Sequence, residues 1–147
     1  MPRLRRLNRA LAQPLTQDDV ALVAAAVVTM RKHYRPFWHT VVAALRMDDG
    51  RIVTGVHLGA TVGRMAICAE AVAVGRAVLE GGGTIIRAVA VRHPKPDEDG
   101  EIAVVSPCGG CRELFADHAP DAGVIVPGSD GLAVWSVQDL LPLPYQR

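Results

Sequence analysis

The spacing of apolar and polar residues predicts helices and strands in alternation along the chain. Thr16 and Asp19 have the spacing of a helix-capping box. We therefore expect the first helix to run from Thr16 to about His33, just before a proline that would stop it. Two stretches rich in Val, Ala and Ile, 39–47 and 51–58, flank an Asp-Asp-Gly turn and predict a β-hairpin.

A second helix is expected from about Ala66 to the three-glycine run at 81–83, which supplies a C-cap and breaks the helix. Apolar residues recur along it at helical spacing, and we expect this face to pack on the sheet. The face consists of Ile67, Ala71, Val74 and Val78.

The elements in the second half of the chain are short. Residues 84–91 predict a fully buried strand, and 102–105 predict a short strand or the end of an interrupted one. A third helix is expected from about Cys108 to His118. The strands 123–127 and 132–135 are joined by only four residues. Because so short a link cannot make a parallel crossover, this pair should be antiparallel.

This order of elements predicts an α/β domain with a three-layer α/β/α arrangement around a mixed five-stranded sheet, whose last two strands form an antiparallel hairpin. A short helix capped by Ser136 would complete it. The 147 residues suit a single domain over 1–147, since chains of this size bury a core without staples. Residues 1–14 are expected to be a loose N-terminal tail.

Composition narrows the range of partners and locations. A net charge of +1 and an aromatic content of 4% give little attraction to a nucleic acid polymer or an anionic membrane surface. No apolar run approaches the ~20 residues that span a membrane. An odd number of cysteines, three, argues against a disulfide framework and favours the cytoplasm. The mean hydropathy of +0.20 favours a buried subunit interface.

The three cysteines carry the candidate chemistry. Cys68 lies two residues before Glu70 at an expected helix start, and Cys108 and Cys111 lie in a Pro-Cys-Gly-Gly-Cys-Arg turn at another. Three thiolates can hold Zn²⁺ while leaving one position open, and a nearby carboxylate can then move protons to and from a zinc-bound water. A Cys or His two residues before a Glu, followed by Pro-Cys-x-x-Cys, is the signature of zinc nucleobase deaminases.

One geometric condition applies to this interpretation, and other interpretations stay open. Residues two apart in a helix interior point to nearly opposite sides, because each residue turns by ~100°. Cys68 and Glu70 can therefore face one cavity only in the first turn.

A thiol redox or structural zinc protein without turnover is the non-enzymatic alternative. In a closed structural zinc site, His57 would be the fourth ligand.

At these residues the chain resembles the zinc-dependent cytidine deaminase superfamily, and within it the small homotetrameric cytidine deaminases and blasticidin S deaminase. The resemblance runs from the hairpin at 41–55 to Leu140-Leu141-Pro142. It implies one zinc ion per subunit on the three cysteines, Glu70 as proton shuttle, and backbone contacts from Ala69 and Ser106 to the pyrimidine. It also implies a homotetramer that converts a small aminated pyrimidine, such as cytidine, deoxycytidine or a related nucleoside, to the uracil-type product and ammonia.

Departures from the family pattern concern the substrate. The Asn-x-Glu that holds the ribose is replaced by His57-Leu58-Gly59, and Ala71 stands where an arginine is frequent. His57 either contacts a substrate hydroxyl or carboxylate or is a packed residue at a strand end. Blasticidin S deaminase shares both departures, so a blasticidin-S-type or other aminated-heterocycle deaminase is the alternative. The roles of His39, Trp38 and Tyr145 stay open.

Overall fold

The computed structural model describes residues 12–147. The helices are α1 (Gln17–His33), α2 (Ala69–Glu80), α3 (Gly109–His118) and α4 (Val137–Leu140), and a 3₁₀ turn, η1, spans Gly63–Met65. The strands are β1 (Val41–Met47), β2 (Ile52–Val56), β3 (Ile85–Arg92), β4 (Ala103–Val105), β5 (Gly123–Gly128) and β6 (Gly131–Ser136). No helix within residues 12–147 is long and apolar enough to cross a membrane.

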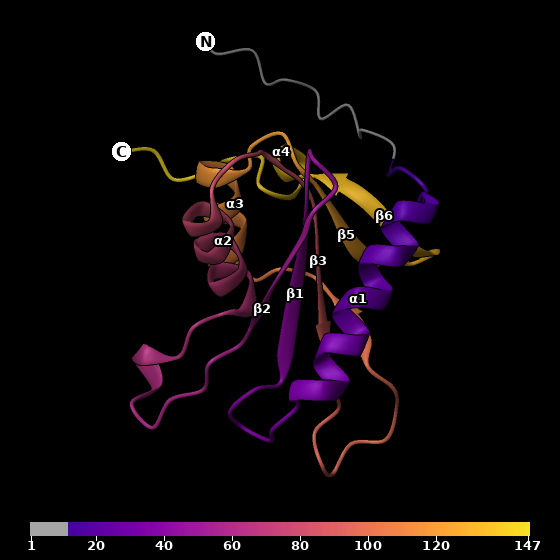
Figure 1. The fold of residues 1–147 in the computed structure, drawn as a ribbon, viewed down its shortest axis with the longest axis vertical. Coiled ribbons are helices and arrows are strands. Elements are labelled where there is room, and N and C mark those ends of the chain that lie inside the picture. Colours follow the sequence, from indigo (N-terminus) through magenta and orange to yellow (C-terminus); the bar gives the residue numbers. More distant parts are fainter. Residues whose placement is uncertain (1–11) are drawn as a thin grey trace.

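A mixed β-sheet forms the middle layer of the fold. Its strand order is β2-β1-β3-β5-β6, with β4 paired to β3. Helix α1 covers one face, and α2 and α3 cover the other (Figure 1). The expected three-layer α/β/α architecture is therefore confirmed. Both predicted hairpins are present, because β1 pairs antiparallel with β2 and β5 pairs antiparallel with β6.

The sheet has six strands where five were expected. The sixth is β4, which pairs antiparallel with the end of β3 and sets Val105 opposite Ala90. Strand β5 pairs parallel with the beginning of β3, where Gly123 lies opposite Arg87. The expected number of strands was wrong because the 93–102 loop turns the chain back along β3. The three residues of β4 are then enough to pair with β3.

Helix α1 begins at the predicted capping box. Thr16 Oγ1 accepts a hydrogen bond from the Asp19 N–H at 3.2 Å, and Asp19 Oδ2 accepts one from the Thr16 N–H at 3.0 Å. The Asp19 carboxylate is fully buried and also accepts hydrogen bonds from Arg46 and Arg87, both at 2.8 Å. This cluster joins the start of α1 to β1 and β3.

Successive residues of a strand point to opposite faces of the sheet and so divide the core in two. Ala43 and Leu45 of β1 pack with α2 and α3, whereas Val42 and Ala44 pack with α1. The odd-numbered positions of β1 therefore identify the face on which α2 and α3 begin.

Helix α2 packs on the sheet with a different face from the one expected. The residues buried against the sheet have small side chains: Ala69, Ala73 and Ala77. Ile67 and Val78, expected to be buried, are 41% and 65% exposed, whereas Val74 is buried as expected. The prediction failed because alanines let the helix approach the sheet more closely than branched side chains do, and this leaves the larger apolar residues outside.

Most of the expected loose tail, residues 1–14, lies outside the described residues. At its described end, Gln13 exchanges backbone hydrogen bonds with Val134 of β6 at 2.9 and 2.8 Å. These two bonds tie the chain to the edge strand β6 just before α1 begins.

Candidate active site

The first half of the site is the N-terminus of α2. Cys68 is the N-cap residue of this helix, and Glu70 lies in its first turn. Gly55 of β2 lies directly against that turn, since a Cβ at this position would come within 2.6 Å of the Ala69 carbonyl oxygen and closer still to the Ala73 nitrogen. The missing side chain at Gly55 therefore lets the first turn rest on the sheet, which sets the positions of Cys68 and Glu70.

The second half of the site is the N-terminus of α3. Cys108 is the N-cap residue, and its Sγ accepts a hydrogen bond from the Cys111 N–H at 3.4 Å. Arg112 holds this turn in place. Its Nε donates to the Pro107 carbonyl and its Nη1 to the Leu140 carbonyl, both at 3.0 Å. The start of α3 is thereby tied to the end of α4.

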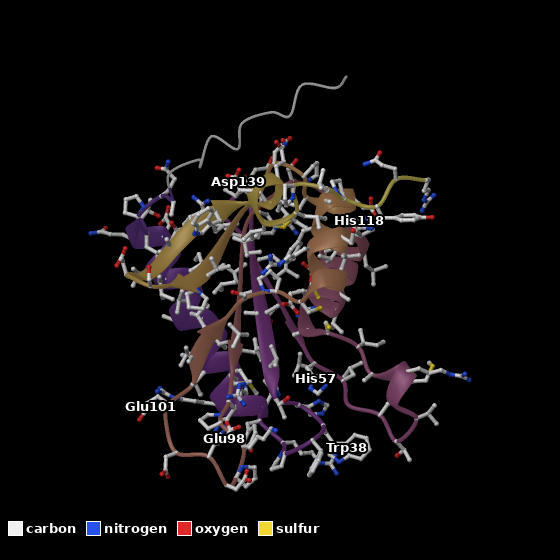
Figure 2. All side chains as sticks on the ribbon, turned by 180° about the vertical axis from the view of Figure 1, so that it is seen from behind. Trp38, His57, Glu98, Glu101, His118 and Asp139 are labelled. Atoms are coloured by element: carbon white, nitrogen blue, oxygen red, sulfur yellow. The ribbon has the colours of Figure 1, made fainter. Side chains whose placement is uncertain are left out.

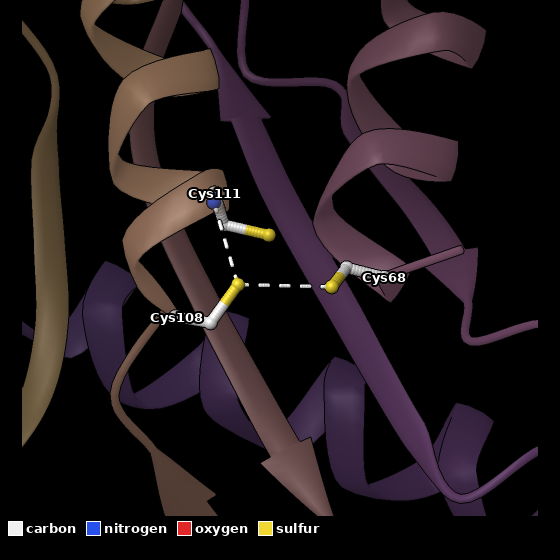
Figure 3. Close-up of side chains that lie close together, drawn as sticks. All are labelled: Cys68, Cys108 and Cys111. Atoms are coloured by element: carbon white, nitrogen blue, oxygen red, sulfur yellow. Dashed lines mark hydrogen bonds between the residues drawn. The ribbon is translucent and has the colours of Figure 1, made fainter. Parts of the chain in front are cut away.

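The two helix ends bring the three cysteine sulfurs together (Figure 3). Cys68 Sγ lies 3.8 Å from Cys108 Sγ, and all three sulfur atoms lie within 4.8 Å of one another. Among residues 12–147 this is the one group of three or more His, Cys, Asp or Glu side chains with ligand atoms so close. His57 is not part of it, so a zinc site closed by His57 finds no support in the described chain.

Glu70 meets the geometric condition that the sequence imposed. It is the second residue of α2, in the open first turn, and only 6% of it is exposed. Its negative charge opposes ionisation of all three cysteine thiols, which puts the carboxylate beside them. Within the described part of the chain this carboxylate accepts no hydrogen bond. A buried carboxylate without such a partner is available for proton transfer.

The protonation of the thiols shows why a cation suits this site. Burial raises the pKa of Cys68, and it raises the pKa of Cys111 much further, with Glu70 acting in the same direction. Burial also opposes ionisation of Cys108, but the Cys111 N–H and the neighbouring thiols outweigh it and lower the pKa of Cys108. Three thiolates this close are stable together only when a cation lies between them.

The donor set fits zinc. Tetrahedral zinc binds cysteine sulfur at about 2.3 Å, which sets two ligand sulfurs about 3.8 Å apart. The Cys68–Cys108 separation of 3.8 Å equals that spacing. The N-termini of α2 and α3 carry partial positive charges that offset the negative charge of three thiolates. The cysteine cluster can therefore hold one zinc ion, and no protein ligand among residues 12–147 fills a fourth position.

His57 lies just after β2, at the same end of the sheet as Trp38 and Glu98 (Figure 2). Its Nδ1 accepts a hydrogen bond from the Thr40 N–H at 3.3 Å and lies 3.1 Å from Thr40 Oγ1. These contacts assign the proton of the neutral ring to Nε2. Burial lowers the pKa of His57, and the charge of His39 lowers it further. His57 is thus a neutral hydrogen-bond donor.

Ala69 and Ser106 lie within two residues of the cysteines in sequence. Ala69 follows Cys68 as the first residue of α2 and is fully buried. Ser106 is exposed and lies between β4 and the turn that begins at Cys108.

The structure shows local contacts for the three residues with open roles. His39 Nδ1 donates to the His57 carbonyl at 3.0 Å and so supports the position of that residue. Trp38 is 38% exposed, and the Arg35 guanidinium lies 5.5 Å from its ring centroid. The Tyr145 N–H donates to Glu113 on α3, and its side chain is exposed.

Sequence reasoning missed the role of Gly55. Gly55 sets the approach of α2, and a glycine inside a strand with Val and Ile neighbours was the available signal.

Comparisons with known proteins agree with this geometry. Residues 16–126 match the family model described as the cytidine and deoxycytidylate deaminase zinc-binding region. A Bacillus cereus protein named blasticidin-S deaminase is 43% identical over 134 residues, which cover 90% of this chain and 96% of that protein. A cytidine deaminase of Halalkalibacterium halodurans is 29% identical over 128 residues, which cover 85% of this chain and 92% of that protein.

A solved structure extends the similarity from sequence to fold. The crystal structure of cytidine deaminase from Mycobacterium leprae superposes with a TM-score of 0.68 at 29% identity and covers 84% of this chain and 97% of that one. The region matched by the family model includes the three cysteines and Glu70. This chain belongs to the cytidine and deoxycytidylate deaminase family and is a zinc-binding, hydrolytic deaminase.

Proposed function

We propose that this enzyme removes the exocyclic amino group of a cytosine-type ring in a small nucleoside-like compound. Water supplies the oxygen, so a C–O bond forms, the C–N bond breaks, and the products are the uracil-type compound and ammonia. No oxidant or reductant is required. The observation that carries the proposal is the buried Glu70 carboxylate beside three converging cysteine sulfurs.

Each residue of the site has a proposed role. Cys68, Cys108 and Cys111 hold zinc, which when bound activates water at neutral pH. Glu70 accepts a proton from the attacking water and returns protons to the ring nitrogen and the departing amine. The backbone segments at Ala69 and Ser106 hold the pyrimidine next to Glu70.

Blasticidin S is the first substrate to test. The relative with that printed activity is 43% identical and is matched over 96% of its length. His57-Leu58-Gly59 supplies a neutral imidazole donor in place of a carboxylate, and this alters which hydroxyl or acidic group the site can bind. Cytidine and deoxycytidine are the second candidates, because a cytidine deaminase matches 85% of the chain.

A glutamate substitution tests the reaction. The zinc-loaded protein should release ammonia from at least one of blasticidin S, cytidine, deoxycytidine and cytosine, followed by absorbance and ammonia assay. Glu70→Gln should lower kcat by ~10²- to 10⁴-fold, because proton transfer is lost, while zinc content stays equal. Glu101→Gln is the matched control, since this glutamate is exposed at the sheet end where β4 begins. Full activity of Glu70→Gln, or no ammonia from the native protein with any of the four compounds, would contradict the proposal.

The outer surface of α2 supports assembly as a homotetramer. Val78 and Leu79 are 65% and 88% exposed, and Val62 and Met65 before the helix are 56% and 61% exposed. Large apolar side chains that are this exposed in a single chain are candidates for burial against another copy. Burial of a large aliphatic side chain contributes about 1.5–3 kcal/mol. Copies of the chain therefore gain stability when they cover this surface, and we propose four copies on the ground of the family resemblance.

The cytoplasm is the compartment that fits the thiol chemistry. All three cysteines are free, and the sulfur atoms of Cys68 and Cys108 are already 3.8 Å apart. An oxidising compartment would favour a disulfide between such neighbours and destroy the zinc site. A reducing compartment keeps the three thiols available for the metal.

A further inference from the structure

The half of the zinc site that lies on α3 is built on a turn with little packing of its own. Gly109 and Gly110 stand between Cys108 and Cys111 and are the first residues of α3. A Cβ at Gly109 would meet no atom within 4 Å outside the helix backbone, and one at Gly110 would meet only Cys108 Sγ at 3.9 Å. Because glycine leaves the backbone its widest freedom, contacts from elsewhere must fix the two cysteines.

Arg112, the residue after Cys111, makes these contacts. Its Nε donates to the carbonyl of Pro107, the residue before Cys108, and its Nη1 donates to the Leu140 carbonyl, both at 3.0 Å. Pro107 itself is buried. A planar guanidinium holds two acceptors at a fixed spacing. Arg112 therefore brackets the turn that carries both cysteines and ties it to a residue 28 positions further along the chain.

The Arg112 side chain has no acidic partner among residues 12–147. Its described hydrogen bonds go to the two backbone carbonyls, and no carboxylate in this part of the chain forms an ion pair with it. An arginine bonded in this way holds main chain in place and does not neutralise an acid.

The anchor at the end of α4 is fixed in the core. Val137, the first residue of α4, is 2% exposed, and its N–H donates to the Ala122 carbonyl at 3.2 Å. Leu140 packs against the core that lies beneath α2 and α3. Burial thus opposes any displacement of Leu140, and Arg112 passes this restraint to the cysteine turn.

Glu113 adds a second tie, to the end of the chain. Its Oε1 and Oε2 accept hydrogen bonds from the Tyr145 N–H at 3.0 and 3.3 Å. The chain leaves α4 and passes α3 on its way to the C-terminus (Figure 1). Two consecutive residues after Cys111 therefore hold the main chain at 140 and at 145, and the segment 140–145 is fastened to the start of α3 at both of its ends.

We propose that Arg112 is a positioning residue of the zinc site, and that the segment 140–145, held by Arg112 and Glu113, slows release of the metal. The proposal rests on the proposed role of the cysteines as zinc ligands. Residues that orient metal ligands from behind contribute ~10- to 100-fold to metal affinity. Here the effect should fall on the two cysteines of α3, because Cys68 lies on α2.

Transfer of zinc from the loaded, full-length enzyme to an excess of a coloured chelator measures the release rate. Arg112→Gln should release zinc ~10-fold faster than the native protein, or more. Arg112→Lys keeps the charge but lacks the fork that spans the two carbonyls, so it should resemble Arg112→Gln. A native rate in Arg112→Gln overturns the inference. A native rate in Arg112→Lys overturns it too, because charge alone would then be sufficient.

Arg51→Gln is the matched control. Arg51 also donates to backbone carbonyls, those of Gly81 and Gly82. These lie past the C-terminal end of α2, whereas Cys68 caps its N-terminus. Arg51→Gln should leave the release rate within twofold of native. Equal acceleration in Arg51→Gln and Arg112→Gln would reflect a general loss of stability and would overturn the positioning role.

A spectrum separates positioning from stability. Cobalt(II) bound in place of zinc gives thiolate-to-metal absorption bands that depend on the arrangement of the sulfur ligands. These bands should shift in Arg112→Gln and stay native in Arg51→Gln. Native bands in Arg112→Gln would overturn the inference even where the variant unfolds more easily. If Arg112→Gln does not fold, Arg112→Lys takes its place in both measurements.

Glu113 tests the contribution of the C-terminal segment. Glu113→Ala removes the acceptor of the Tyr145 N–H and should speed zinc release by about threefold to tenfold. Glu113→Gln keeps an acceptor oxygen and should remain within twofold of native. A native rate in Glu113→Ala overturns the part of the inference that concerns the C-terminal segment.

Cys108→Ser distinguishes this inference from the proposed function. Zinc that stays bound in Cys108→Ser overturns the site of three cysteines, and the inference falls with it. Loss of zinc from Cys108→Ser, together with a native release rate in Arg112→Gln, overturns only the positioning role of Arg112.

Discussion

Cys68 and Cys108 are 40 residues apart in sequence, yet their sulfur atoms lie 3.8 Å apart. Each is the N-cap residue of its helix, and both helices begin on the same face of the sheet. The unpaired N–H groups and positive ends of two helices therefore surround a cluster of thiols and one carboxylate. This arrangement gathers negative charge where it can be offset, which is the electrostatic basis of the metal site.

Removal of either N-cap sulfur should abolish stable zinc binding. We expect Cys68→Ser and Cys108→Ser to retain less than a tenth of the native zinc after dialysis, because two sulfurs cannot replace three ligands. Metal analysis by atomic absorption checks this. Ser129→Ala, in the turn between β5 and β6, is the control and should keep its zinc. One zinc per chain in Cys68→Ser would show that the cluster is not the site.

Gly55 should be sensitive to the smallest substitution. Gly55→Ala puts a Cβ within 2.6 Å of the Ala69 carbonyl oxygen, so α2 must shift and we expect a loss of about 1–3 kcal/mol in the free energy of unfolding. The zinc affinity should fall with it, because Cys68 moves. Gly75→Ala on α2 has open space and should be neutral or stabilising by up to about 1 kcal/mol. Denaturant unfolding compares the two, and equal effects would refute the packing argument.

The buried carboxylate of Asp19 should make stability depend on pH. Burial opposes its ionisation, but the Thr16 N–H and Arg87 outweigh burial and lower the pKa of Asp19. A lowered pKa means stabilisation that is complete above the unfolded value of about 3.9 and is lost as pH falls through the folded value. Asp19→Asn should lower the free energy of unfolding at pH 7 by about 3 kcal/mol, because Arg46 and Arg87 lose their partner.

Urea unfolding at pH 7 and at pH 3 measures this effect. Asp18→Asn is the matched control, since Asp18 is 85% exposed, and it should change stability by less than about 0.5 kcal/mol. The native protein should lose more stability than Asp19→Asn between the two pH values. Parallel losses in the two proteins would rule out Asp19 as the source.

His57 should remain neutral at pH 7 and take up a proton only below the ordinary histidine value of about 6.5. Burial, followed by the charge of His39, lowers the pKa of His57. His39→Gln removes the second cause and should move the pKa of His57 upward, while Gln can still donate to the His57 carbonyl. An NMR titration of the His57 ring measures both values. An unchanged or lower pKa in His39→Gln would contradict this account.

The exposed apolar surface of α2 should hold the subunits together. Leu79→Asp should shift the protein towards smaller species in analytical ultracentrifugation, because it puts a charge at a residue that is 88% exposed in the single chain. Val28→Asp, on the outer face of α1, is the control at a residue that is 63% exposed. Dissociation by Val28→Asp alone would place the interface on α1 instead.

Local features of the fold could be predicted because their causes are local. The Thr16–Asp19 box begins α1, and Ser136 caps α4 by accepting the Asp139 N–H at 3.0 Å. The link between β5 and β6 is too short for any pairing but an antiparallel one. Sequence also identified the three cysteines and Glu70, because their spacing follows from the chemistry of one metal site.

Pairing and packing between distant segments could not be predicted in the same way. The residues from Ile67 to Val78 offer two apolar faces, and only contact with Gly55 decides that the alanine face is buried. The short β4 becomes a strand only because β3 offers it an unpaired edge. Sequence patterns contain no information about which edge or which face is free.

By itself the sequence therefore determined the order of the elements, the helix ends and the cysteines that can hold zinc, and it predicted Glu70 as the proton carrier. Tertiary structure alone decided that the sulfurs of Cys68 and Cys108 converge and that His57 stays outside the metal cluster. The physical reason is that caps and motifs depend on neighbours within a few residues, whereas strand register and helix packing depend on free energy shared across the whole sheet.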